Sequence, residues 1–280
     1  MTYEMLLKLG IKKAVENDKE PEAVKFLLLE TFGGDAHQFY MIQKEEADLA
    51  VETLFLDRLK AYTHQATPVQ HLLGYAYFFG EKFVVNNAVL IPRLETEQLV
   101  EHTLYYYDTY MKDLSVSVLD LGCGSGCIGL TLKREAPLID VTLSDISEDA
   151  LHVAKENARG LDVDFILSDL FEGIHGAFDI IVSNPPYIPD SEDVMDIVKK
   201  EPSVALYGGS LGLDFYEKIM IQAKNHIKSD GLIAFEHGFQ QKEPILKLAQ
   251  THYQGATIIQ MKDLQGKDRF TFIGLGRILG

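Results

Sequence analysis

Four residues that could take part in a reaction follow directly after FDIIVS, an apolar run that predicts a buried strand. They are Asn184, Pro185, Pro186 and Tyr187. Each proline fixes its own φ and restricts the residue before it to extended backbone, so this segment is stiff. The side-chain carbonyl of Asn184 and the backbone carbonyl of Pro185 can accept hydrogen bonds. Together they can receive both hydrogens of one planar NH₂ group, with the ring of Tyr187 packed against that group.

A glycine-rich turn, DLGCGSG at residues 120–126, lies between an earlier predicted strand and a predicted helix. Its three glycines let the backbone approach a ligand without interference from Cβ atoms, and the helix start offers free N–H groups. Asp145 ends the next predicted strand, 19 residues after Gly126, a spacing that suits an acid accepting from ribose hydroxyls. This pairing fits either a dinucleotide or an adenosyl ligand.

Two details favour S-adenosylmethionine as the cofactor. The glycines are spaced G-x-G-x-G, not G-x-G-x-x-G, and Asp120 precedes them. An acid at that position would repel a pyrophosphate but can accept hydrogen bonds, directly or through water, from a cationic amino-acid group. At the third strand end, Asp169 and Leu170 suit an adenine ring, although a surface turn explains them equally well. The residues predicted to bind the cofactor are Asp120, Gly122, Cys123, Gly124, Ser125, Gly126, Asp145, Asp169, Leu170 and Asn184.

The two groups of residues together predict methyl transfer to an amide or amino nitrogen. Such a nitrogen is a poor nucleophile because its lone pair is delocalised, so orientation and dipoles must assist the attack on a methyl sulfonium. The proton can leave after transfer, and no strong general base is needed. The residues predicted to be catalytic are Asn184, Pro185, Pro186 and Tyr187. Taken alone, this motif would also fit a turn that caps a strand.

The elements that position these residues follow from the hydrophobic pattern. From residue 116 onward, short apolar strands alternate with helical segments, which predicts a parallel sheet with helices on both faces. Ligands bind beyond the carboxyl ends of such strands. Residues 1–74 show several helix-period patterns and predict a small helical domain. Residues 75–91 predict a linking β-hairpin with a turn at Gly80-Glu81, so the remaining domain spans 92–280.

Composition narrows the class of protein. Hydrophobic residues make up 46% and charged residues 24% of the 280 residues, as in ordinary soluble proteins. No apolar run approaches the roughly 18 residues of a membrane helix, and acids interrupt the start where a signal peptide is apolar, so we expect a cytoplasmic protein without a membrane partner. Cys123 and Cys127 form neither a disulfide framework nor a metal set, and no metal is predicted. A net charge of −16 without a basic cluster argues against direct nucleic-acid binding.

With these residues in place, the chain resembles the HemK/PrmC family of protein-(glutamine-N5) methyltransferases, which act on peptide chain release factors. NPPY alone is shared with adenine N6 methyltransferases, so the accompanying segments narrow the resemblance. These segments are, in the order of the family, TPVQHLLGYAYFFG at 67–80, IPRLETE at 91–97, DLGCGSG at 120–126, SDIS at 144–147, SNPPYI at 183–188, EPSVAL at 201–206, GLDFYEKI at 212–219 and KDLQGKDRF at 262–270.

The resemblance implies a class I S-adenosylmethionine-dependent methyltransferase: an α/β, Rossmann-like fold with a seven-stranded, mostly parallel sheet, preceded by the helical domain and hairpin. It implies that Asn184 and Pro185 hold the glutamine amide of a Gly-Gly-Gln loop, with Tyr187 packed on it, and that the reaction tunes translation termination. It also implies that residues 1–74 help to dock the release factor.

Four further residues stand in the family's segments without an assigned chemical role. Arg93 and Glu95 are expected near the entrance for cofactor or substrate. His71 and His237 stand where the family often has other residues, and a variable packing or solvent-edge position is the simplest interpretation of both.

Two alternatives stay open. One is an amino methyltransferase acting on adenine or cytosine, which must extract a base and hold a polyanionic backbone. The other is a cofactor-binding module without catalysis, which would not need the Asn-Pro-Pro-Tyr segment.

Overall fold

The computed structural model describes residues 1–112 and 114–280 and divides the chain into two compact units. The first unit comprises Met1–Tyr75 and Val194–Lys200, and the second comprises Ala76–Asp193 and Glu201–Gly280. The segment Val194–Lys200 therefore belongs to the helical unit, although the sequence pattern places it inside the range 92–280.

The first unit is helical. Side chains of Thr2, Asp35 and Asp48 accept backbone N–H bonds at three helix starts, as N-cap residues do. Gly33 ends one helix in the left-handed conformation, with φ +77°. The helices are α1 (Tyr3–Glu16), α2 (Pro21–Phe32), α3 (Ala36–Ile42), α4 (Leu49–Gln65) and α5 (Val69–Leu73). Their fully buried side chains include those of Leu6, Leu27 and Phe55.

A β-hairpin follows, formed by β1 (Tyr75–Phe78) and β2 (Glu81–Val84). Its turn consists of Phe79 and Gly80, with φ values of +53° and +78°. Positive φ at both central residues is the geometry that matches the twist of a two-residue hairpin. The predicted turn at Gly80-Glu81 is therefore wrong by one residue, because Phe79 adopts a left-handed conformation that its side chain disfavours.

The second unit contains one seven-stranded sheet in the order β5-β4-β3-β6-β7-β9-β8. The strands are β3 (Ser117–Leu121), β4 (Asp140–Asp145), β5 (Asp164–Leu167), β6 (Phe178–Ser183), β7 (Ile227–Glu236), β8 (Thr257–Lys262) and β9 (Asp268–Gly274). The first five of the sheet order pair in parallel, whereas β9 is antiparallel to both β7 and β8. The predicted α/β fold with a mostly parallel sheet is confirmed.

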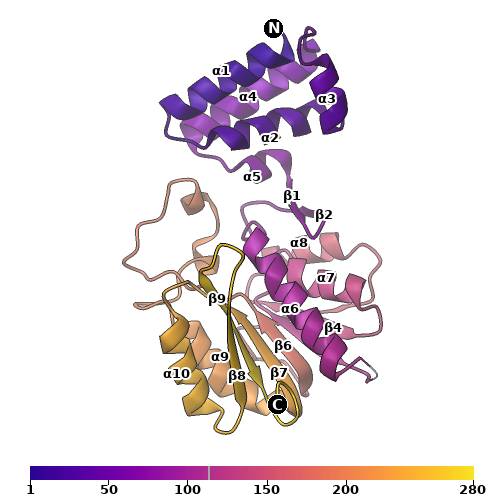
Figure 1. Ribbon diagram of the computed structural model, residues 1–280, viewed down its shortest axis with the longest axis vertical. Helices are drawn as coiled ribbons and strands as arrows, with labels where there is room; N and C mark the ends of the chain where they lie inside the picture. Colours follow the sequence, from indigo (N-terminus) through magenta and orange to yellow (C-terminus); the bar gives the residue numbers. More distant parts are fainter. Residues whose placement is uncertain (113) are drawn as a thin grey trace. The chain divides into compact units, whose positions relative to one another are not determined.

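Helices cover both faces of this sheet (Figure 1). They are α6 (Leu94–Tyr110), α7 (Cys127–Glu135) and α8 (Glu148–Ala158) on one face, and α9 (Asp214–Gln222) and α10 (Lys242–His252) on the other. Short 3₁₀ turns lie at Ser203–Ala205 and Ala223–Asn225 in this unit and at Val198–Lys200 in the first unit. Adjacent strand residues serve opposite faces: Val118 and Ile180 pack with the first set, and Leu119 and Ile181 with the second. Burial on both faces explains why these strands are continuously apolar.

The connectivity creates one switch point. From β3 the chain adds β4 and β5 on one side, and then crosses to place β6 on the other side of β3. Ligands in doubly wound sheets bind where the strand order reverses, beyond the carboxyl ends of the strands. That position lies after Leu121 and Ser183, the last residues of β3 and β6. Among the described helices, none is both long and apolar enough to cross a bilayer.

Candidate active site

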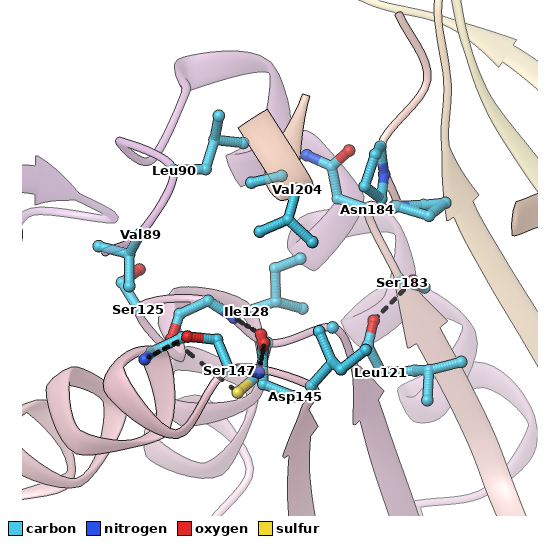
Figure 2. Close-up of a pocket in the computed structure, with 18 of the residues that line it drawn as sticks. Val89, Leu90, Leu121, Ser125, Ile128, Asp145, Ser147, Ser183, Asn184 and Val204 are labelled. Carbon is cyan, nitrogen blue, oxygen red and sulfur yellow. Dashed lines mark hydrogen bonds between the residues drawn. The ribbon is translucent and has the colours of Figure 1, made fainter. Parts of the chain in front are cut away.

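A pocket lies beyond the carboxyl ends of β3, β4, β5 and β6 (Figure 2). The structure brings most of the sequence-predicted site residues together in its lining, while Asp120, Gly126 and Tyr187 lie outside that lining. The predicted residues that line it are Gly122, Cys123, Gly124, Ser125, Asp145, Asp169, Leu170, Asn184, Pro185 and Pro186.

The glycine turn serves two different purposes. Gly122 and Gly124 have φ values of +73° and +54°, and a Cβ atom at either would meet nothing within 4 Å, so their backbone faces open space in the pocket. At Gly126, with φ +78°, a Cβ atom would lie 2.9 Å from Leu130 Cδ1 and 3.1 Å from Leu143 Cδ2. Gly126 is thus needed for the packing of α7, whereas the other two glycines shape a cradle for a ligand.

Asp120 belongs to β3 itself and is fully buried. Its Oδ2 accepts from the backbone N–H of Gly129, at 2.8 Å, and its Oδ1 has no hydrogen-bond partner within the described chain. Burial raises the pKa of this carboxyl to about 7, against the lowering effect of the Gly129 N–H. Asp120 supports the start of α7 from behind the pocket lining, and its bond to a cofactor stays a prediction.

Asp145 combines a structural and a ligand-facing position. Its Oδ2 accepts from the N–H of Gly124 at 2.8 Å, and its Oδ1 from the N–H of Ser147 at 2.9 Å. Burial raises the pKa of Asp145, while these backbone bonds lower it. Each carboxylate oxygen has two lone pairs, so both can accept a further bond from a ligand in the pocket.

The loop after β5 is held in an unusual conformation. Leu170 has φ +50°, and the hydroxyl of Ser168 donates to the Leu170 carbonyl at 2.8 Å. Exposed Asp169 and half-buried Leu170 both line the pocket. They present a polar and an apolar group at the position predicted for the adenine ring.

Asn184 is oriented by its amide nitrogen. Its Nδ2 donates to Oγ1 of Thr96 at 3.3 Å, and its buried Oδ1 has no partner among the described residues. Figure 2 shows Asn184 at the pocket beside Val204. The neighbouring Ser183 hydroxyl donates to the Leu121 carbonyl at 2.6 Å and ties the ends of β6 and β3 together. The unpaired Oδ1 is therefore an acceptor prepared for a donor from outside the chain.

Tyr187 packs against the apolar cluster between the sheet and α9–α10. Burial raises the pKa of its hydroxyl to about 12, so the phenol stays protonated and does not serve as a general base near neutral pH. Its carbonyl accepts from Nε2 of Gln241 at 2.8 Å. The same Nε2 also lies 3.0 Å and 3.3 Å from the carbonyls of Gly212 and Leu211.

Sequence reasoning missed three residues around the motif: Thr96, Glu236 and Gln241. Glu236 ends β7 and is fully buried; burial raises the pKa of its carboxyl to about 7, and Thr96, Arg269 and the Asn184 amide lower it. One signal could have found Glu236, because it ends an apolar strand, as Asp145 does. Thr96 and Gln241 lie on a helix and in a turn, where the sequence gives no comparable signal.

Arg93 lines the pocket and pairs with Glu201, at 2.5 Å between Nη2 and Oε1. The other carboxylate oxygen of Glu201 accepts from the N–H of Ile91 at 2.9 Å. Buried Glu201 thereby joins the segments IPR and EPSVAL, and the second of these brings Val204 to the pocket.

The other three residues without an assigned role lie in different surroundings. His71 is a half-buried residue of α5 in the first unit. Glu95 accepts from Nε2 of Gln265 at 3.4 Å. His237 is fully buried, and burial lowers its pKa, so it is neutral packing at this position.

Comparison with known proteins decides the family. Residues 103–256 match the family model of the methyltransferase small domain. A release factor glutamine methyltransferase from Bacillus cereus is 35% identical over 265 residues, which cover 92% of this chain and 93% of that protein. One from Bacillus subtilis is 36% identical over 273 residues, 94% of each chain. This chain belongs to the release factor glutamine methyltransferase family.

The resemblance to the HemK/PrmC family is thereby confirmed. A solved methyltransferase from Pyrococcus furiosus, 20% identical with a TM-score of 0.51, covers 71% of this chain and 90% of its own, and shares the fold. Within residues 1–112 and 114–280 of this release factor glutamine methyltransferase, no group of three or more His, Cys, Asp or Glu side chains could hold a metal ion.

We predict that Gln241→Ala destabilises this methyltransferase by about 1–3 kcal/mol, because it leaves the Tyr187 carbonyl and the N–H of Gly238, which bonds Oε1 at 2.9 Å, without their side-chain partner. Urea unfolding followed by circular dichroism measures this loss. Gln240→Ala is the matched control, since Gln240 is the exposed neighbour. Equal midpoints for both variants would contradict the assigned role of Gln241.

Proposed function

We propose that this protein transfers a methyl group from S-adenosylmethionine to the side-chain amide nitrogen (N5) of the glutamine in the Gly-Gly-Gln loop of peptide chain release factors, and so tunes translation termination. The observation that carries the proposal is the buried, unpaired Oδ1 of Asn184, next to Pro185 at the switch point of the sheet. Relatives that align with more than 90% of the chain are named release factor glutamine methyltransferases, which supports the same substrate class.

The residues around the glycine turn fit S-adenosylmethionine. The open cradle beside Gly122 and Gly124 has room for a ligand close to the backbone, and the free lone pairs of Asp145 suit ribose hydroxyls. Asp169 and Leu170 would flank the adenine ring. When bound, S-adenosylmethionine supplies an electrophilic methyl group on a sulfonium.

Asn184 and Pro185 would orient the acceptor. A primary amide has two N–H hydrogens in one plane, and the Oδ1 of Asn184 and the carbonyl of Pro185 would each accept one of them. Orientation of this kind lowers the entropic part of the activation barrier, because the amide is already aligned with the methyl group before the reaction. The two carbonyl dipoles also favour the positive charge that develops on the attacking nitrogen. Pro186 keeps the segment stiff, and the ring of Tyr187 supports the planar amide.

A protein substrate agrees with the charge of the chain. The net charge of −16 opposes the phosphate contacts that supply most nucleic-acid affinity, so we propose that nucleic acid is not a direct partner. Release factors act at ribosomes, and we therefore propose a cytoplasmic location.

Asn184→Ala is expected to lower the methylation rate of a purified release factor by about 100-fold or more, because one hydrogen bond and the orientation of the amide are lost. The affinity for S-adenosylmethionine should change less than about threefold, because Asn184→Ala leaves both oxygens of Asp145 anchored by backbone N–H groups and still able to accept from the cofactor. Peptide mass spectrometry of the Gly-Gly-Gln segment gives the rate and the site together. Asn225→Ala, at an exposed asparagine of the same unit, is the control and should keep the parent rate.

The same assay includes a duplex DNA oligonucleotide as a second substrate. Methylated DNA with an unmodified release factor would replace our substrate by an adenine or cytosine amino group. Cofactor binding with neither product would favour a binding module without catalysis.

Asp145→Ala is expected to weaken S-adenosylmethionine binding by about tenfold to a hundredfold, because the hydrogen bonds that the cofactor donates to a charged carboxylate are lost. Isothermal titration calorimetry with the intact protein measures the affinity. Asp140→Ala, at the exposed opposite end of β4, removes an equal charge and should leave the affinity unchanged. An unchanged affinity for Asp145→Ala would remove this residue from the cofactor site.

We also propose that residues 1–74 dock the body of the release factor, with 75–91 as a linking hairpin and 92–280 as the methyltransferase domain. Deletion of 1–74 should lower kcat/KM for the whole release factor about tenfold or more, because remote contacts position the reacting group. A short Gly-Gly-Gln peptide, which lacks that body, should lose little. Retained binding of S-adenosylmethionine verifies that the remaining unit is folded, and full activity on the whole factor would refute docking.

A further inference from the structure

We propose that Glu236 is a positioning residue whose ionised carboxylate keeps the amide of Asn184 turned with Nδ2 toward Thr96 and Glu236, so that Oδ1 stays unpaired and available to a substrate amide. The proposal rests on the function proposed above and adds a residue to it. Glu236 would select which atom of the Asn184 amide, Oδ1 or Nδ2, is presented to the substrate, because the Asn-Pro-Pro-Tyr segment alone allows both orientations.

The sheet brings the two side chains together. Strand β7 pairs in parallel with β6, and Ser183 is the register partner of Phe235, so the next residues, Asn184 and Glu236, follow at corresponding positions. Side chains at corresponding positions of adjacent parallel strands point to the same face. Thr96 of α6 approaches both from that face, since it accepts from Asn184 Nδ2 and lowers the pKa of Glu236.

An amide can be presented in two ways that have nearly the same shape. Rotation by 180° exchanges the acceptor oxygen and the donor nitrogen, and only the first can receive an N–H of a substrate amide. The hydroxyl of Thr96 both donates and accepts, so it does not choose between the two orientations. An ionised carboxylate only accepts, and it therefore favours an Asn184 with its NH₂ group directed toward Glu236. A protonated Glu236 could donate to Oδ1 and would permit the reverse orientation.

The surroundings set the ionisation of Glu236 near neutrality. Burial, the largest effect, and the nearby charge of Glu95 together raise its pKa to about 7, against the lowering effects of Thr96, Arg269 and the Asn184 amide. Burial also raises the pKa values of the uncharged groups that face it. The ionisable groups that face Glu236 are Glu95 of α6, Cys127 of α7, Tyr187 of the motif, Tyr216 of α9 and Arg269 of β9.

The carboxylate form of Glu236 is present above its pKa and is lost as the pH falls through about 7. The value of kcat for release factor methylation should therefore rise with pH through about 7 and then level off. Asp120 has a pKa of about 7 as well, so a pH profile of the parent protein alone does not assign the effect to Glu236.

The first test is the pH profile of Glu236→Gln, measured with the intact protein, S-adenosylmethionine and a whole release factor. Glutamine both donates and accepts, so it permits either orientation of Asn184. We expect kcat at pH 8 to fall about tenfold, the KM for S-adenosylmethionine to stay within twofold, and the rise attributed to Glu236 to disappear. A rise due to Asp120 would persist in this variant. A parent-like kcat and profile would overturn the proposal.

The second test uses Glu95→Gln, which keeps Glu236 and Asn184 intact. Removal of the like charge should lower the pKa of Glu236 and move the midpoint of the kcat profile to lower pH, with the plateau unchanged. Glu95 is not among the groups that shift Asp120, so an Asp120 titration would not move. This variant decides the question even if Glu236→Gln does not fold, and an unmoved midpoint would overturn the proposal.

Failure of the inference and failure of the proposed function give different results. A parent protein that binds S-adenosylmethionine but methylates no release factor at any pH would refute the function. A parent protein that methylates the release factor, with both variants showing its pH profile, would refute only the role of Glu236.

Discussion

A buried hydrogen-bond acceptor without a partner is the constraint on which the site depends. The Oδ1 of Asn184 is enclosed and unpaired within the described chain. Leaving such a group unpaired costs about 1–3 kcal/mol, and the chain would recover this free energy by letting the amide turn or the loop relax. The surrounding structure must therefore hold the amide in place. A substrate N–H would pair with Oδ1 and remove this cost, which favours the binding of a hydrogen-bond donor.

Much of the second unit can be understood as the support for this position. Apolar burial on both faces fixes β6, and Ser183 joins its end to β3 through the Leu121 carbonyl. On the other side of the motif, Gln241 holds the Tyr187 carbonyl. Between these two anchors, the prolines leave the backbone little freedom. Rigid strand ends and side-chain anchors thus replace the flexibility that a surface loop would otherwise have.

The sequence predicts those parts of the fold that depend on local patterns. Alternation of apolar strands and helices identified the sheet, and glycine spacing with Asp145 located the turn that lines the pocket. Residues whose role depends on partners far away in the sequence were not predicted from these local patterns. Gln241 in particular lies 54 positions from Tyr187, and nothing in its neighbours indicates that it bonds three carbonyls. The hairpin turn was displaced because Phe79 takes a positive φ, which sequence preference assigns to glycine.

Two fully buried acids lie near the carboxyl ends of strands, Asp120 next to the last residue of β3 and Glu236 as the last residue of β7, and each has a carboxylate oxygen without a partner in the described chain. Hydrophobic residues of similar volume would avoid the cost of desolvating these carboxyls and are often neutral or stabilising at buried charged positions. Stability alone therefore gives no reason for acids here. A carboxylate differs from an apolar side chain in that it fixes the direction of a donor near it, whether the N–H of Gly129 in α7 or the NH₂ of an asparagine. In a protein that must orient one amide nitrogen and one cofactor, control over the direction of hydrogen bonds is the property for which a buried acid is suited, and raised pKa values are its consequence.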